Sequence, residues 1–139
     1  MNWLARREHS LSELRDKLAA RDFEPEIVAE TVAQLAADGL VSDERFAEAF
    51  VTARMRKGQG PVRIRAELKK RGISAELVQL QVVEAGRDWF ALASDVRARK
   101  FGAEIPPDFK DKARQMRFLE YRGFDGDQIQ AAFNNNSKK

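Results

Sequence analysis

Few residues of this chain have the types and spacing that chemistry requires. His9 is the only histidine, and nothing with metal-ligand or catalytic-triad spacing accompanies it. We expect a surface or helix-capping role for His9, because it directly precedes Ser10, a residue type favoured at helix N-caps. The chain contains no cysteine, which excludes disulfides, thiolate metal sites and cysteine nucleophiles.

Two further motifs resemble reactive sites but have simpler structural explanations. Asp43 and Glu44 form a carboxylate pair, yet they fall in the first turn of an expected helix, where the positive dipole end favours acids. The segment Gly58-Gln59-Gly60-Pro61 looks like a phosphate-binding loop, but no strand precedes it and it lacks the Gly-Lys-Ser ending. A glycine turn before a proline-started helix explains it better. The sequence therefore predicts no catalytic residues, no cofactor and no metal, and an enzymatic function is kept only for completeness.

The distribution of charge along the chain is a stronger signal than any single residue. The formal net charge is only +3. Residues 22–50 nevertheless hold eight acidic side chains against the single Arg45, and residues 51–71 hold eight basic side chains against the single Glu67. Such separation is typical of an electrostatic contact with nucleic acid or with an acidic protein surface. The alternative is a solvated pair of helices whose charges complement the helix dipoles.

The basic half of this pattern predicts a binding surface on one helix and on the turn before it. On a helix that begins at Pro61, Ile64 and Leu68 share the buried face. Four cations border that face, namely Arg63, Arg65, Lys69 and Lys70, and three more close the preceding helix, namely Arg54, Arg56 and Lys57. The net excess of seven positive charges in twenty-one residues favours a contact surface over the dipole explanation.

An all-helical fold is expected to position these residues. Apolar residues recur at helical spacing, as in Leu11, Leu14 and Leu18, and no run alternates with period two for long. Start signals agree with that pattern: a capping box at Ser10 and Glu13, prolines suited to first helical positions at 25 and 61, and N-cap serines at 42 and 74. Glycines fall near the expected helix ends, at positions 39, 58, 72, 86, 102 and 123. About nine short helices follow from these signals.

The expected helices repeat along the chain. Residues 14–23 align with residues 64–73, fifty positions later, and residues 118–124 supply a third copy of the helix, the basic turn and the apolar residue after it. Residues 46–58 align with residues 90–102 as a helix that runs from an aromatic residue to a basic end. Each unit therefore has three helices. We predict three tandem three-helix repeats in an elongated array, straight or curved.

The predicted units are residues 1–39, 40–86 and 87–134. The first unit is short, because its opening helix would hold only residues 1–7, so either the natural N-terminus lies upstream or this unit is partly frayed. The polar tail at 135–139 lacks apolar periodicity and is expected to be disordered.

The same sequence also bounds where the protein works and how it associates. No apolar stretch is long enough to span a bilayer, and charged residues stand where a signal peptide would have its apolar region, so a cytoplasmic protein with no membrane contact is expected. Uneven terminal repeats argue against an open-ended polymer and favour a monomer.

Several of these stretches together resemble the RecX family of bacterial recombination regulators. The resemblance is carried by Leu-Ala-Arg-Arg-Glu-His-Ser at residues 4–10, Asp-Glu-Arg-Phe-Ala-Glu at 43–48, the long motif at 58–73, and residues 117–124. The match runs in order through nearly the whole chain, and the motif at 58–73 is specific. The sequence departs from the family at its beginning, where many members have a further stretch before residue 4.

The resemblance implies three tandem three-helix repeats, a cytoplasmic bacterial protein and no enzymatic activity. It also implies a partner, the RecA recombinase: family members lodge in the groove of the RecA filament on single-stranded DNA, suppress its ATP hydrolysis and strand exchange, and limit filament growth. A weak contact with single-stranded or double-stranded DNA is expected beside it. The motif positions Gly60, Arg63, Arg65 and Arg71 are the expected contacts, joined on charge grounds by Arg54, Arg56, Lys57, Lys69 and Lys70. The alternative is an autonomous DNA-binding protein that acts through residues 54–71.

Overall fold

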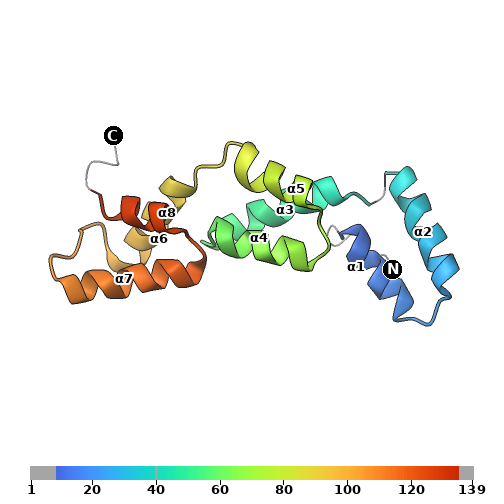
Figure 1. Cartoon of the computed structure of the whole chain (residues 1–139), viewed down its shortest axis with the longest axis horizontal. Coiled ribbons are helices and arrows are strands. Elements are labelled where there is room, and N and C mark those ends of the chain that lie inside the picture. Colours follow the sequence, from blue (N-terminus) through green and yellow to red (C-terminus); the bar gives the residue numbers. More distant parts are fainter. Residues whose placement is uncertain (1–8, 40, 135–139) are drawn as a thin grey trace.

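The computed structural model describes residues 9–39 and 41–134, and every regular element within those ranges is a helix (Figure 1). The elements are α1 (Leu11–Ala19), α2 (Pro25–Ala37), α3 (Asp43–Arg56), α4 (Pro61–Lys70), α5 (Ala75–Gln79), a π-helical continuation η2 (Leu80–Glu84), α6 (Trp89–Phe101), α7 (Phe109–Arg122) and α8 (Gly126–Ala132). They confirm the all-α fold class. The predicted opening helix at 1–7 and the predicted disordered tail at 135–139 lie outside the described residues.

The helices form successive units along an elongated molecule (Figure 1). Helices α1 and α2 lie at one end, α3 to η2 in the middle, and α6 to α8 at the other end. Each unit has its own cluster of buried apolar side chains, centred on Leu14, Val28 and Val32 in the first, on Phe46, Ile64 and Leu68 in the second, and on Ala93, Leu119 and Phe124 in the third. The predicted tandem helical units are confirmed: the second and third units have the expected three helices, with η2 continuing α5, and the described part of the first holds α1 and α2.

The clusters also show how neighbouring units share residues at their borders. Val41 packs with the first cluster, although the sequence assigned it to the second unit. Trp89 packs with the second cluster and donates a hydrogen bond from its indole Nε1 to the Val82 carbonyl at 2.8 Å, so the start of α6 closes the end of η2. The unit borders are therefore packed contacts rather than free linkers.

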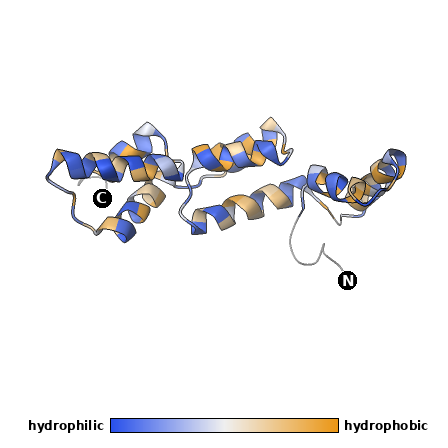
Figure 2. Ribbon diagram, turned by 90° about the horizontal axis from the view of Figure 1, so that it is seen from below, coloured by the Kyte–Doolittle hydropathy of each residue, from blue (hydrophilic) through white to orange (hydrophobic). Residues whose placement is uncertain are grey.

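The helices begin and end where local chemistry predicts. Figure 2 shows hydrophobic and hydrophilic residues interspersed along each helix, as expected for short helices with one buried face. Ser10 and Glu13 form the predicted capping box, Ser42 and Ser74 each accept a backbone N–H at the start of their helices, and Pro25 and Pro61 stand in the first turn. These side chains satisfy backbone groups that a helix end leaves without partners.

Units two and three are joined by direct backbone contact. The backbone N–H of Gly60 donates to the Arg122 carbonyl at 2.8 Å, and that of Val62 donates to the Gly123 carbonyl at 2.9 Å. A Cβ atom added to Gly60 would lie 2.5 Å from the Gly123 oxygen, which is closer than real Cβ atoms approach any neighbour. Only glycine at position 60 lets the two backbones meet.

Units one and two meet at the equivalent positions. The Ser10 hydroxyl, fifty positions before Gly60, donates to the Arg71 carbonyl at 3.0 Å. Gly72 packs against Ser12, because a Cβ added to this glycine would lie 2.5 Å from the Ser12 Cβ. In both joints the Arg-Gly turn of one unit therefore docks on the N-terminus of the equivalent helix in the unit before it. We call each of these contacts an inter-unit joint.

The first unit keeps the turn but not the glycine. Asp22 aligns with Gly72 and has φ 65°, and it is the only non-glycine residue with positive φ in the described part of the chain. Its short polar side chain belongs to the few types that tolerate this conformation. The turn geometry is thus repeated three times, and the turns at Gly72 and Gly123 each dock on the unit before them.

Replacing Gly60 by alanine should weaken the joint between units two and three. Because the added methyl group meets backbone rather than a movable side chain, we expect Gly60→Ala to lower the free energy of unfolding by about 1–3 kcal/mol in urea titrations. Gly126→Ala is the matched control: nothing lies within 4 Å of a Cβ at that helix-starting position, so its stability should be unchanged or slightly raised. Equal stabilities for the two variants would contradict the joint.

Candidate partner-binding surface

Helix α4 presents the predicted basic surface. Pro61, Ile64 and Leu68 are buried, with the last two fully so, which confirms the predicted apolar face. On the rest of the helix Arg65, Lys69 and Lys70 are exposed. A ten-residue helix is about 15 Å long, so these cations extend from its middle to the end that approaches unit one.

Arg54 and Arg71 face inward rather than toward solvent. The Arg54 guanidinium lies 3.4 Å from a Glu67 carboxylate oxygen, and the Arg71 guanidinium lies 4.0 Å from the same oxygen. Both guanidinium groups also lie over the Phe50 ring, 4.4 and 5.0 Å from its centroid. Partly buried arginines held by a carboxylate and an aromatic face contribute to packing as well as charge. These two residues tie α3 to α4.

Arg71 also ties the second unit to the first. Its Nη1 donates to the Glu13 carboxylate at 2.5 Å, and the side chains are only 30% and 17% exposed. Beside this ion pair, the backbone N–H of Leu11 donates to Asp43 Oδ1 at 2.7 Å. Asp43 was predicted to have a structural role in the first turn of its helix, and α3 does begin there. The cross-link to α1 is an addition that no sequence pattern indicated.

Gly60 and Arg63 also belong to a joint. Gly60 is buried under the Gly123 carbonyl, so its backbone is covered by the third unit. Arg63 is partly buried, and its guanidinium lies 5.7 Å from the centroid of the Tyr121 ring, which is itself 75% exposed. Arg63 therefore reaches the surface beside the inter-unit joint between units two and three. Gly60 has a structural role, because its lack of a side chain lets the two backbones approach.

Arg56 and Lys57 are exposed at the end of α3, away from Lys69 and Lys70 at the end of α4. They line a groove together with basic residues of the third unit. The nine predicted contact residues thus divide into three sets. The first set is buried or partly buried, namely Arg54, Gly60, Arg63 and Arg71. The second is the exposed part of α4, namely Arg65, Lys69 and Lys70, and the third is the exposed end of α3, namely Arg56 and Lys57.

The expectation of a surface or capping role for His9 was wrong. His9 is 1% exposed, and the N-cap of α1 is Ser10. The physical reason is the inter-unit joint: the hydrogen bond from the Ser10 hydroxyl to the Arg71 carbonyl holds the start of α1 against the end of α4, and His9 is buried with it. Local sequence shows that a helix starts here, but not what packs over the start.

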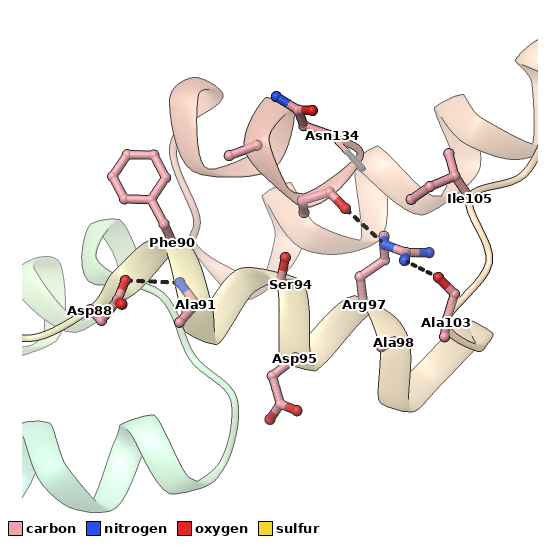
Figure 3. Close-up of a pocket in the computed structure, with 12 residues that line it drawn as sticks. Asp88, Phe90, Ala91, Ser94, Asp95, Arg97, Ala98, Ala103, Ile105 and Asn134 are labelled. Carbon is pink, nitrogen blue, oxygen red and sulfur yellow. Dashed lines mark hydrogen bonds between the residues drawn. The ribbon is translucent and has the colours of Figure 1, made fainter. Parts of the chain in front are cut away.

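The third unit contains a hollow of about 480 Å³ beside α6 (Figure 3). Arg97 reaches into its wall and is only 4% exposed, with hydrogen bonds from its guanidinium to the Ala132 and Ala103 carbonyls, both at 3.1 Å. Burial lowers the pKa of Arg97 from its ordinary value, yet a guanidinium keeps its proton in proteins. Arg97 therefore fastens α6 to the end of α8 and to the loop after α6. Nothing in this wall resembles a nucleophile paired with a base.

The described residues contain no group of three or more histidine, cysteine, aspartate or glutamate side chains that could hold a metal ion. None of the helices in the described ranges is long and apolar enough to cross a membrane.

Fold and surface together define a class of protein: a tandem array of small helical units whose clearest candidate site is a charged outer surface. Family models for the first, second and third three-helix domains of RecX match residues 1–35, 42–80 and 87–133. The chain belongs to the RecX family.

Individual relatives agree with this assignment. The regulatory protein RecX of Halorhodospira halophila is 46% identical over 93% of this chain and 80% of its own length, and that of Pseudomonas tolaasii is 44% identical over 93% and 83%. The crystal structure of RecX from Lactobacillus salivarius superimposes with a TM-score of 0.80 over 98% of this chain and 90% of that chain, at 20% identity. The relatives bear the name of regulatory proteins, and the crystal structure shows that the fold is shared.

A double-mutant cycle should detect the ion pair that links units one and two. Glu13→Gln keeps an acceptor for the capping box while removing the charge, and Arg71→Gln removes the guanidinium. Because both side chains are largely covered, we expect a coupling free energy of about 0.5–1 kcal/mol from urea unfolding. The exposed pair Asp111 and Arg114 is the control and should couple by less than about 0.5 kcal/mol. A coupling near zero for the first pair would show that this ion pair does not link the two units.

Proposed function

We propose that this protein binds the RecA filament on single-stranded DNA and inhibits its ATPase, recombinase and filament extension activities. Membership of the RecX family is the observation that carries this proposal. The relatives' name as regulatory proteins supports action on another protein rather than catalysis. In this role the chain works in the bacterial cytoplasm as a monomer, in the regulation of DNA repair.

The architecture suits a polymeric partner. An elongated array of three similar units presents similar helices at regular intervals, and successive subunits of a filament also repeat at regular intervals (Figure 1). Contacts that are weak singly become strong when several form at once, because the later ones are intramolecular. Filament binding therefore needs no deep pocket and no catalytic group.

Arg65, Lys69 and Lys70 are the residues of α4 best placed to contact the partner. All three are exposed, and the helix that bears them is fixed by its buried Ile64 and Leu68. A rigid helix with a basic outer face would meet acidic protein surface or phosphate without first being ordered. Arg54 and Arg71 would support that helix from behind rather than touch the partner.

The second candidate function is an autonomous DNA-binding protein that acts through residues 54–71. The exposed cations of this segment favour it, since cations that neutralise phosphates release counterions. The two functions differ in what they need: the first requires RecA, and the second only DNA.

Titration into a RecA ATPase assay separates them. With the protein below the RecA concentration and salt held constant, we expect the rate of ATP hydrolysis on single-stranded DNA to fall, and excess DNA not to restore it. No fall, or a fall that added DNA reverses, would favour the autonomous DNA binder.

Reversing the charge of α4 should remove this inhibition. We expect the triple variant Arg65→Glu, Lys69→Glu and Lys70→Glu to need at least about tenfold more protein for half-maximal inhibition, because each attraction becomes a repulsion. The matched control reverses Arg15, Lys110 and Arg117, which are also exposed but lie on α1 and α7. Circular dichroism establishes that both variants fold. Equal inhibition by the triple variant and the control would remove this face of α4 from the interface.

A further inference from the structure

A groove between units two and three gathers the ends of three helices. It has a volume of about 380 Å³, and its lining includes the last turns of α3, α6 and α7. Five basic side chains line it, namely Arg56, Lys57, Arg99, Lys100 and Arg122, and Asp95 is the only acidic one among its lining residues. The groove thus holds a net charge of four positive. We call it the basic groove.

Helix dipoles explain only part of this charge. Cations near helix C-termini are stabilising, and each C-terminus carries the equivalent of about half a negative charge. Three such ends amount to about one and a half negative charges. The side chains lining the groove exceed that by more than two positive charges. The positive charge that remains is not explained by the helix dipoles.

Three of the five cations, Arg99, Lys100 and Arg122, have side-chain contacts within the chain before any ligand arrives. The Arg122 Nη1 donates to the Lys57 carbonyl at 2.8 Å, a contact between units two and three. The Arg122 guanidinium and the Lys100 ammonium lie over the Phe118 ring, 5.1 and 5.5 Å from its centroid. Arg99 pairs with Asp95 at 2.9 Å, so the one carboxylate of the groove is already engaged. Fixed side chains lose less freedom when they bind.

The chemistry of the lining distinguishes between anionic ligands. Lysine and arginine side chains are hydrogen-bond donors without acceptors. A phosphodiester backbone presents acceptor oxygens and no donors, so it matches this lining. An acidic peptide presents backbone N–H groups that also require acceptors, and Asp95, the only acidic side chain here, is paired with Arg99. The remaining lining is largely apolar, with Leu92, Val96 and Phe118 among it.

We propose that the basic groove binds the phosphate backbone of single-stranded DNA, through residues of both the second and the third unit. This proposal rests on the proposed function only in its choice of ligand, because a protein bound to the RecA filament lies close to single-stranded DNA. The proposed site combines Arg56 and Lys57 with Arg99, Lys100 and Arg122 of the third unit. It does not include the exposed cations of α4.

The test measures binding of the full chain to a fluorescent oligothymidylate by anisotropy, in the absence of RecA and over a series of salt concentrations. Lys57→Gln with Lys100→Gln removes two groove charges at exposed positions. Arg15→Gln with Lys110→Gln removes two charges elsewhere and is the matched control. We expect the groove variant to bind about five- to tenfold more weakly, and its salt slope to fall by about 1.4, because single strands contribute about 0.7 per neutralised phosphate. The control should keep both values, and circular dichroism melting curves check the folding of each variant.

Three outcomes would overturn the proposal. The first is no measurable binding by the unaltered protein, and the second is an equal loss in the groove variant and the control. The third is displacement of the oligothymidylate by polyglutamate at equal charge concentration, which would identify the groove as a site for acidic protein. Since RecA is absent from this assay, each outcome leaves the ATPase inhibition to be judged by itself.

Discussion

The close approach of backbones at the two inter-unit joints is the constraint on which the rest of the structure depends. A unit of about 45 residues buries too little surface to be very stable alone, so its neighbours must contribute. At one joint Gly60 lies under the Gly123 carbonyl, and at the other Gly72 lies against Ser12. Hydrogen bonds to the Arg122 and Arg71 carbonyls complete the two contacts. Without glycine at these positions the units could not dock at this spacing.

The joints explain why part of the basic segment faces inward. Arg71 lies in the turn that docks on unit one, and its guanidinium pairs with Glu13 there. Arg54 approaches Glu67 and Phe50, which places it on the same internal network. Three cations of α4, namely Arg65, Lys69 and Lys70, stay exposed. Part of the charge excess in the sequence therefore holds helices together, and the rest forms an exposed basic surface.

The joint between units two and three also creates the basic groove. Because the Arg-Gly turn after α7 docks on the start of α4, Arg122 reaches the end of α3 and bonds to the Lys57 carbonyl. The end of α6 lines the same groove with Arg99 and Lys100. Each helix end is basic in the manner expected of a helix C-terminus, but their convergence concentrates the charge. One packing contact thus both joins the units and brings together cations that are more than forty residues apart in the chain.

The sequence by itself determined the helical fold, the helix starts and the repeat, because caps, prolines and apolar periodicity act over a few residues. It also identified the motif at 58–73 and the charged segment, and with them the family. Only the tertiary structure decided that His9 is buried, that Asp43 bonds to α1, and that Arg71 faces Glu13. It alone placed Arg99, Lys100 and Arg122 beside Lys57, although the basic ends of the aligned helices at 46–58 and 90–102 are visible in the sequence. The helix ends that come into contact are set by how closely the backbones of neighbouring units approach, and local sequence patterns do not encode that distance.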